Sequence, residues 1–171
     1  MYQWIRRALI PVIVAGTALS GPSLGAEPPA EATAFVNAAA QAGLMEVQAA
    51  KLALNASASA AVKTFATRMV ADHEKIHAEL AAIAKAKQIP VPGTLDADHA
   101  KRVTSLRGLT GTSFDTAYAM QMVDDHAKAV ELFQANVSQP DGELAAFAGK
   151  TLAVLQEHKR LADNLKANLK N

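Results

Sequence analysis

Apolar residues recur every three or four positions through most of the chain, the spacing that gathers side chains on one face of a helix. This pattern predicts four long helices, which we expect at residues 33–54, 60–87, 113–137 and 141–169. Prolines and a glycine end the second of them, at Pro90, Pro92 and Gly93. Alanine, leucine, lysine, glutamate and glutamine dominate these ranges, so the sequence predicts an all-α fold.

The connections between these helices predict how they are arranged. Short turns at 55–59 and around Pro140 favour antiparallel neighbours, and we expect Ser57 or Ser59 and Asp141 to cap the helices that follow. Residues 112–115 resemble a capping box that opens the third helix. The connection 88–111 is long enough to run the length of a bundle and carries a short amphipathic segment at 99–109. We therefore expect a ferritin-like four-helix bundle with one long crossover that carries a short extra helix, the alternative being a plain up-down-up-down bundle.

The first 26 residues have the pattern of a signal peptide. Arg6 and Arg7 precede the apolar run 8–19, which is short for a membrane span, and cleavage is expected after Ala26 or near Ser20. The mature domain would then be 27–171, periplasmic or otherwise exported, free or associated with the outer membrane. No transmembrane segment is expected in this mature chain. The absence of cysteine excludes both disulfides and a lipid-modified N-terminal cysteine.

The net charge and the absence of known catalytic motifs argue against several classes of function. Removing residues 1–26 removes two of the 17 basic residues and none of the 16 acidic ones, which leaves a net charge of −1. A nearly neutral, mixed-sign chain gives no reason to expect nucleic acid as a partner. There is no cysteine nucleophile, no G-x-S-x-G and no phosphate-binding glycine loop. The sequence favours a protein that is not an enzyme.

One motif recurs three times along the chain. Two apolar residues, a spacer, an acid and a histidine follow one another in 69–73, 122–126 and 154–158. The histidines are His73, His126 and His158, which are three of the five in the chain. Each lies midway along a predicted helix and on its apolar face, so the three imidazoles are expected inside the bundle.

The first helix supplies a fourth polar residue at the same level. Glu46 lies in the middle of its apolar stripe, and Glu46, His73, His126 and His158 are each about 20–26 Å from a helix end in helices about 30–40 Å long. A buried carboxylate or imidazole without a partner costs several kcal/mol. These four groups must therefore satisfy one another or hold a ligand.

An acid precedes each of the three histidines. Asp72, Asp125 and Glu157 point about 100° away from the ring that follows them, so none bonds that ring easily. Each can reach an imidazole on an adjacent helix or act as a metal ligand. Tyr118 and His77 are further candidates beside the cluster, Tyr118 as a partner of His126 and His77 as one half of a helical histidine pair.

Several motifs in order resemble one bacterial family. The segments 35–47, 69–73, 113–118, 122–126 and 155–158, among them M-V-A-D-H, S-F-D-T-A-Y and M-V-D-D-H, are similar to those of the domain of unknown function DUF4142. The resemblance covers about residues 31–168. It implies an exported protein, often described as an outer-membrane protein, with a fold of the ferritin-like superfamily, and it implies no particular activity.

The di-iron members of that superfamily use a Glu-x-x-His motif on two helices. Glu74 to His77 matches this motif in letters, but Glu74 is expected to point toward the rim of the bundle. The fourth helix has Glu157 and His158 side by side and no such motif. The sequence therefore departs from the pattern of a di-iron site.

Three hypotheses follow. The first is a non-enzymatic binding or envelope-stress protein that acts through its surface on an envelope partner or as a homodimer, its polar residues forming a self-satisfied layer. The second is a metal-binding protein, with redox activity as an option, that holds iron, zinc, copper or manganese. The third is a core that responds to pH. In the second hypothesis the ligands are Glu46, His73, His126 and His158, and the additional ligands or orienting partners are Asp72, Asp125, Glu157, Tyr118 and His77.

Overall fold

Five helices make up the part of the chain that the structure, a computed structural model, describes, which is residues 28–169. The predicted signal peptide lies outside these described residues. There is no strand between residues 28 and 169. The helices are α1 (Ala30–Ala56), α2 (Ala60–Ala86), α3 (Ala97–Leu106), α4 (Gly111–Asn136) and α5 (Gly142–Asn168).

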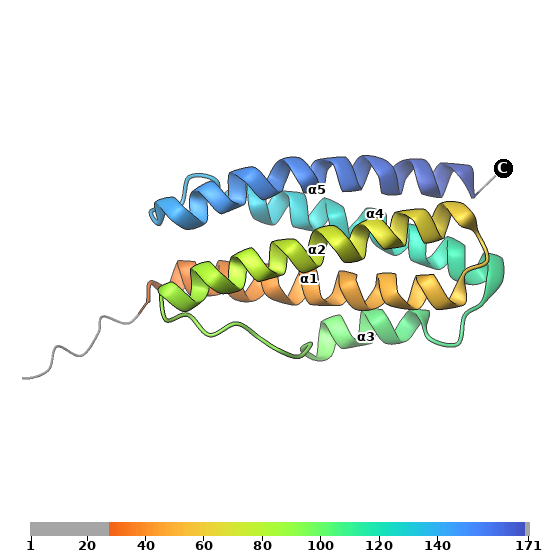
Figure 1. The fold of residues 1–171 in the computed structure, drawn as a ribbon, viewed down its shortest axis with the longest axis horizontal. Coiled ribbons are helices and arrows are strands. Elements are labelled where there is room, and N and C mark those ends of the chain that lie inside the picture. The colour runs from red at the N-terminus through yellow and green to blue at the C-terminus, as the bar shows by residue number, and fades with distance from the viewer. Residues whose placement is uncertain (1–27, 170–171) are drawn as a thin grey trace, which may run out of the picture.

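The four long helices form a bundle of two hairpins, α1 with α2 and α4 with α5 (Figure 1). The crossover from α2 runs back along the whole bundle before α4 begins, so α2 and α4 point the same way. Its short helix, α3, packs mainly on α1. This is the ferritin-like arrangement with one long crossover, which confirms that prediction and excludes the up-down-up-down alternative.

Side chains cap three of the helices. Ser59 accepts a hydrogen bond from the backbone of Val62 at the start of α2, and Asp141 accepts two at the start of α5. Asp96 caps α3 in the same way. Each of these contacts satisfies a backbone N–H that has no partner within its helix.

The capping box predicted at residues 112–115 does not form. Helix α4 begins earlier, at Gly111, and its cap residue Thr110 makes no side-chain hydrogen bond. Gly111 has a φ of 55°, a backbone conformation that glycine adopts without strain. Because the helix starts earlier, Asp115 falls inside it and is buried, not placed at its first turn.

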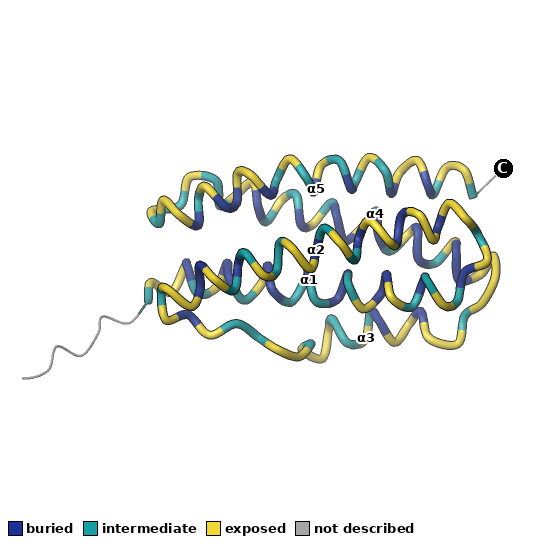
Figure 2. Tube along the Cα trace, in the orientation of Figure 1, coloured by how far each residue is buried: buried dark blue, intermediate teal, exposed yellow. Residues whose placement is uncertain are grey.

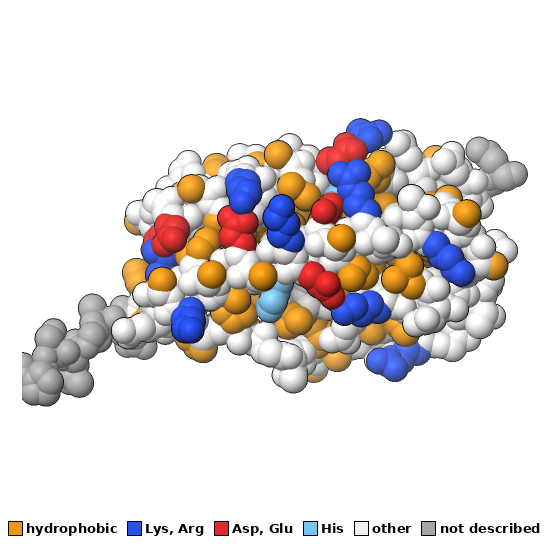
Figure 3. All heavy atoms as spheres, in the orientation of Figure 1, with side chains coloured by type: hydrophobic (Ala, Val, Ile, Leu, Met, Phe, Trp, Pro, Cys, Tyr) orange, Lys and Arg blue, Asp and Glu red, His pale blue; other side chains and the backbone are white. Residues whose placement is uncertain are grey.

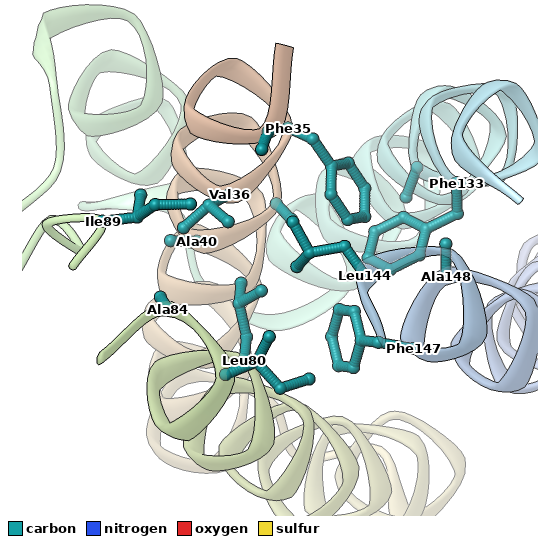
Figure 4. Close-up of a cluster of buried hydrophobic side chains, with 14 of the residues drawn as sticks. Phe35, Val36, Ala40, Leu80, Ala84, Ile89, Phe133, Leu144, Phe147 and Ala148 are labelled. Carbon is teal, nitrogen blue, oxygen red and sulfur yellow. The ribbon is translucent and has the colours of Figure 1, made fainter. Parts of the chain in front are cut away.

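Two apolar clusters fill the interior, one toward each end of the bundle, and the buried positions face inward along every helix (Figure 2). Figure 4 shows the first, in which Phe35 lies edge-on to Phe133 with ring centroids 5.2 Å apart. On each long helix a buried polar residue lies between the two clusters in sequence, and on α4 Asp125 is buried there as well. We call Glu46, His73, His126 and His158 the polar belt.

The surface carries small groups of mixed charge. Figure 3 shows acidic and basic side chains close together over one face, with apolar side chains scattered between them. Met120 is the only large hydrophobic residue that is well exposed among those described. No helix within residues 28–169 is long and apolar enough to cross a membrane.

Candidate metal centre

Three imidazole rings meet at the centre of the polar belt. The ring centroids of His73, His126 and His158 are 5.6, 5.3 and 5.4 Å apart, which is nearly an equilateral triangle. Exposed fractions of 2% for His73 and 0% for the other two show that solvent does not reach them. One ring nitrogen from each residue lies within 4.8 Å of the other two. The repeated motif therefore brings its three histidines together.

One nitrogen of each ring contacts a group outside the three rings, and this group differs from ring to ring. His73 Nδ1 is 3.1 Å from Glu46 Oε2, and His158 Nε2 is 2.8 Å from Asp72 Oδ2. His126 Nδ1 donates to the backbone carbonyl of Met122 at 2.9 Å. A carbonyl oxygen only accepts hydrogen bonds, so His126 carries its proton on Nδ1 and leaves a lone pair on Nε2.

The remaining nitrogens have no protein partner. They are His73 Nε2, His126 Nε2 and His158 Nδ1, all three buried. Leaving one buried polar atom unpaired costs about 1–3 kcal/mol, and here three such atoms belong to one cluster. Ligand nitrogens around a tetrahedral metal, with bonds of about 2.0–2.1 Å, lie about 3.3 Å apart. A spacing within 4.8 Å is close enough for small side-chain shifts to reach that geometry.

Burial keeps these rings neutral. It lowers the pKa of His73 well below its usual value, and the neighbouring rings of His126 and His158 lower it further. Burial likewise lowers the pKa of His126 to about 4, although the bond to Met122 opposes this. The pKa of His158 is also lowered by burial, against the opposing bond to Asp72. Neutral imidazole is the form that binds a metal.

Glu46 lies behind the rings. It contacts Nδ1 of His73, and its Oε1 is 3.5 Å from Nδ1 of His126, whereas the unpaired nitrogens of both rings are Nε2. Burial raises the pKa of Glu46 well above its usual value, Asp125 raises it further, and Arg102 acts in the opposite direction. Oε1 of Glu46 has no hydrogen-bond partner. The contact with Nδ1 suits a carboxylate that orients the His73 ring and leaves Nε2 of that ring to a ligand.

The three acids of the repeated motif have three different surroundings. Asp72 accepts from His158 on the adjacent α5, as expected for an acid that serves a neighbouring helix. Asp125 is buried against Arg102 of α3, and burial raises its pKa. Glu157 is partly exposed and bonds Arg160. Only Asp72 of the three touches a ring of the cluster.

Asp72 is charged. Its partial burial acts to raise its pKa, but hydrogen bonds from His158 and Arg68 outweigh this and hold the pKa below the usual value. An ionised carboxylate on Nε2 of His158 leaves the lone pair of that ring on Nδ1, which is buried and has no protein partner.

Tyr118 and His77 lie outside the cluster. The Tyr118 ring is stacked with Phe114 at 5.8 Å, and its buried hydroxyl bonds neither His126 nor an acid. Burial raises the pKa of that hydroxyl, and the nearby Glu46 adds to the effect. His77 Nδ1 is buried and unpaired, one turn from His73, but no ring nitrogen of His77 is part of the converging group.

Sequence patterns did not indicate two of the contributors. The Met122 carbonyl is backbone, and every residue has one. Arg102 lies in the crossover, where it contacts Asp124 at 2.9 Å as well as Asp125. Its only signal was a basic residue on a short amphipathic helix, which does not specify a partner.

The residues present do not fit a di-iron site. Such sites use four carboxylates from the four helices. Here Glu46 lies behind the rings, Asp125 is bonded to Arg102, and Glu74 pairs with Lys51 in a half-exposed contact. The converging donors are three neutral nitrogens, which favour a single ion.

Comparisons with known proteins agree with the fold. No curated protein matches this sequence. The crystal structure of a DUF305 fragment from Deinococcus radiodurans is similar to this chain with a TM-score of 0.73 and 15% identity, over 82% of this chain and 98% of that one. At that identity the likeness concerns the fold alone. The model of the family described as Domain of unknown function (DUF4142) matches residues 20–165. The chain is therefore a member of the DUF4142 family.

Proposed function

We propose that this protein binds one divalent transition metal ion through His73, His126 and His158. The observation that carries the proposal is that each ring has one unpaired, buried nitrogen in a cluster whose ring nitrogens converge within 4.8 Å. A polar layer that only fixed the register of the helices would be expected to pair its own atoms.

The partners behind the rings support the same function. Ligand histidines in metalloproteins commonly bond a carboxylate or a backbone carbonyl through their other nitrogen, which fixes the ring and its tautomer. Glu46, the Met122 carbonyl and Asp72 supply such a partner to each of the three rings.

Charge also favours a cation at this position. Three neutral imidazoles leave the full charge of a divalent ion in a buried place, where an uncompensated charge is costly. Asp72 is ionised, and Glu46 can become so once a cation lies on the other side of the rings. Two carboxylates then balance the two charges of the ion.

The ligand type narrows the choice of metal. Imidazole suits zinc, copper and iron, whereas manganese prefers carboxylate and water oxygens. Copper(II) is expected to bind most tightly, as it does at most nitrogen sites. Which ion the protein carries in the cell also depends on supply.

Metal analysis of protein purified without a histidine tag tests the proposal. Titration with Co²⁺, whose visible absorption reports the ligands, should give one site per chain in the wild type. The same site should be lost in His73→Ala and His126→Ala. His99→Ala is the matched control, because His99 bonds Asp96 at the surface, away from the cluster. Unchanged metal content in the double variant His73→Ala/His126→Ala would end the proposal.

A further inference from the structure

The metal cluster is closed to solvent, so an ion needs a route to reach it. The three rings are at most 2% exposed, and the apolar clusters fill the bundle on both sides. A route must therefore pass between two helices. The four neighbouring pairs of the bundle are α1–α2, α4–α5, α1–α4 and α2–α5.

The pair α2–α5 is the least extensively packed of these four. Figure 1 shows α5 along the upper edge with α2 below it, and no turn joins the two helices. In contrast, the turn at 57–59 joins α1 to α2 and the turn at 137–141 joins α4 to α5. A boundary with less packing between two hairpins is where local opening costs least.

A cavity lies at this boundary. It has a volume of about 110 Å³, enough for several water molecules, and Asp72, Ile76, Thr151 and Val154 contribute to its wall. Ile76 is three residues after His73, and Val154 is four residues before His158. The cavity is therefore about one helical turn from two of the three rings.

Asp72 joins this cavity to the cluster. Of the three groups behind the rings it is the only one with access to solvent, its side chain being 35% exposed against 2% for Glu46. Both hydrogen bonds that it accepts, from Arg68 and His158, end on Oδ2. Oδ1 is thus left to meet an arriving cation.

The charged side chains that line the cavity are balanced in sign, so they do not repel a cation. Two acids, Asp72 and Glu79, and two lysines, Lys75 and Lys150, line the cavity. Lys150 is neutralised by Glu79 at 2.8 Å. Arg68, which bonds Asp72, is also 3.9 Å from Glu157.

The opposite boundary, α1–α4, has a larger hollow that is held by contacts with the crossover. The hollow measures about 290 Å³ and includes Ala42, Arg102 and Asp125 in its wall. Like the cavity between α2 and α5, it has no member of the polar belt in its wall, but it also has no residue that bonds one of the three rings, as Asp72 does at the α2–α5 boundary. The pair of Arg102 with Asp125 lies there, and α3 packs on α1. Gln41 of α1 fixes the crossover by bonding the backbone of Thr94 and Asp96.

We propose that the metal ion enters and leaves the histidine cluster between α2 and α5, with the Asp72 carboxylate as its first contact. This rests on the proposed metal site and describes how that site is reached. The ion exchanges water for Asp72, then for His158 and the other two rings as the two helices separate slightly.

Filling the cavity tests the route without touching a ligand or its partner. Val154→Phe places a larger side chain from the half-buried rim of the cavity, and Ala42→Leu does the same in the hollow between α1 and α4. Stopped-flow absorption measures uptake of Co²⁺, and a chelator in excess measures its release. If the larger side chain raises the activation barrier for passage between α2 and α5, uptake and release of Co²⁺ should slow by the same factor, and the affinity should stay unchanged. A barrier higher by about 1.4 kcal/mol corresponds to rates about tenfold lower.

The possible outcomes distinguish the proposed entry route from the proposed metal site. Slower exchange in Val154→Phe with wild-type rates in Ala42→Leu supports the proposal, and the reverse pattern overturns it. Equal rates in all three proteins also overturn it, because the ion would then pass elsewhere. Absence of Co²⁺ binding in the wild type would instead reject the metal site. Val154→Leu, a smaller change, replaces the phenylalanine variant if circular dichroism shows that it does not fold.

Asp72→Asn tests the first contact. It keeps an acceptor for His158 and removes the negative charge, so uptake should slow severalfold. Uptake at the wild-type rate would show that the Asp72 carboxylate does not receive the ion.

Discussion

At the scale of single residues, the hydrogen-bond partner of each ring decides which of its two nitrogens is available to a metal. Glu46 Oε2 is 3.1 Å from Nδ1 of His73 and so orients that ring, whereas the Met122 carbonyl accepts from Nδ1 of His126 and orients the second. Asp72 orients the third. The unpaired nitrogens then follow from chemistry, because a ring that is held through one nitrogen offers only the other.

Replacement of Glu46 should weaken metal binding without removing a ligand. Loss of a partner behind a ligand histidine typically costs about 10- to 100-fold in affinity, and Glu46→Ala is expected to fall in that range. Glu46→Gln, which keeps an acceptor of the same shape, should lie closer to the wild type. Competition titration with a chromophoric chelator measures both. Loss of binding as complete as in His73→Ala would instead identify Glu46 as a ligand.

At the scale of elements, α3 is joined to α4 through a buried charge. Arg102 is the partner of Asp125, whose side chain is only 5% exposed. Arg102→Ala leaves this carboxylate unpaired in a place that already raises its pKa, and should lower the free energy of unfolding by about 1–3 kcal/mol. Urea denaturation measures the loss. Adding Asp125→Asn should recover part of it, and a double variant no more stable than the single one would contradict this account.

The helices themselves follow from sequence more readily than their contacts. The apolar period of three to four residues and the caps at Ser59 and Asp141 depend on local chemistry, which one sequence displays. The level of the polar belt follows from helix length. The partners of Asp125 and Glu157 cannot be predicted in this way. Side-chain rotamers and the path of the crossover decide whether an acid contacts an imidazole or an arginine. The start of α4 was misplaced because a glycine with positive φ begins the helix.

At the scale of the whole molecule, the polar belt makes stability depend on pH. The unfolded chain protonates its histidines below about pH 6.5, whereas burial lowers the pKa of His73 and brings that of His126 to about 4 in the folded protein. The unfolded state therefore binds more protons on these rings, and their contribution to stability is lost as the pH falls from about 6.5 toward 4. Glu46 has the opposite sign, because its raised pKa favours the folded state below that pKa and the benefit is lost as the pH rises.

Between pH 5 and 7 the three histidines change the free energy of unfolding more than Glu46 does. We expect the free energy of unfolding of the metal-free protein to be about 1–3 kcal/mol lower at pH 5 than at pH 7. Urea denaturation with a chelator present measures it. A curve that is flat between pH 5 and 8 would show that the belt does not titrate in this way.

The central claim is that His73, His126 and His158 bind a single ion. X-ray absorption spectroscopy of the metal-loaded protein tests it most directly, because scattering from imidazole rings is distinctive and bond lengths are measured. The account predicts three imidazole nitrogens at about 2.0–2.1 Å from one metal. A spectrum dominated by oxygen ligands, or one that keeps its imidazole signal in His73→Ala/His126→Ala, would contradict it.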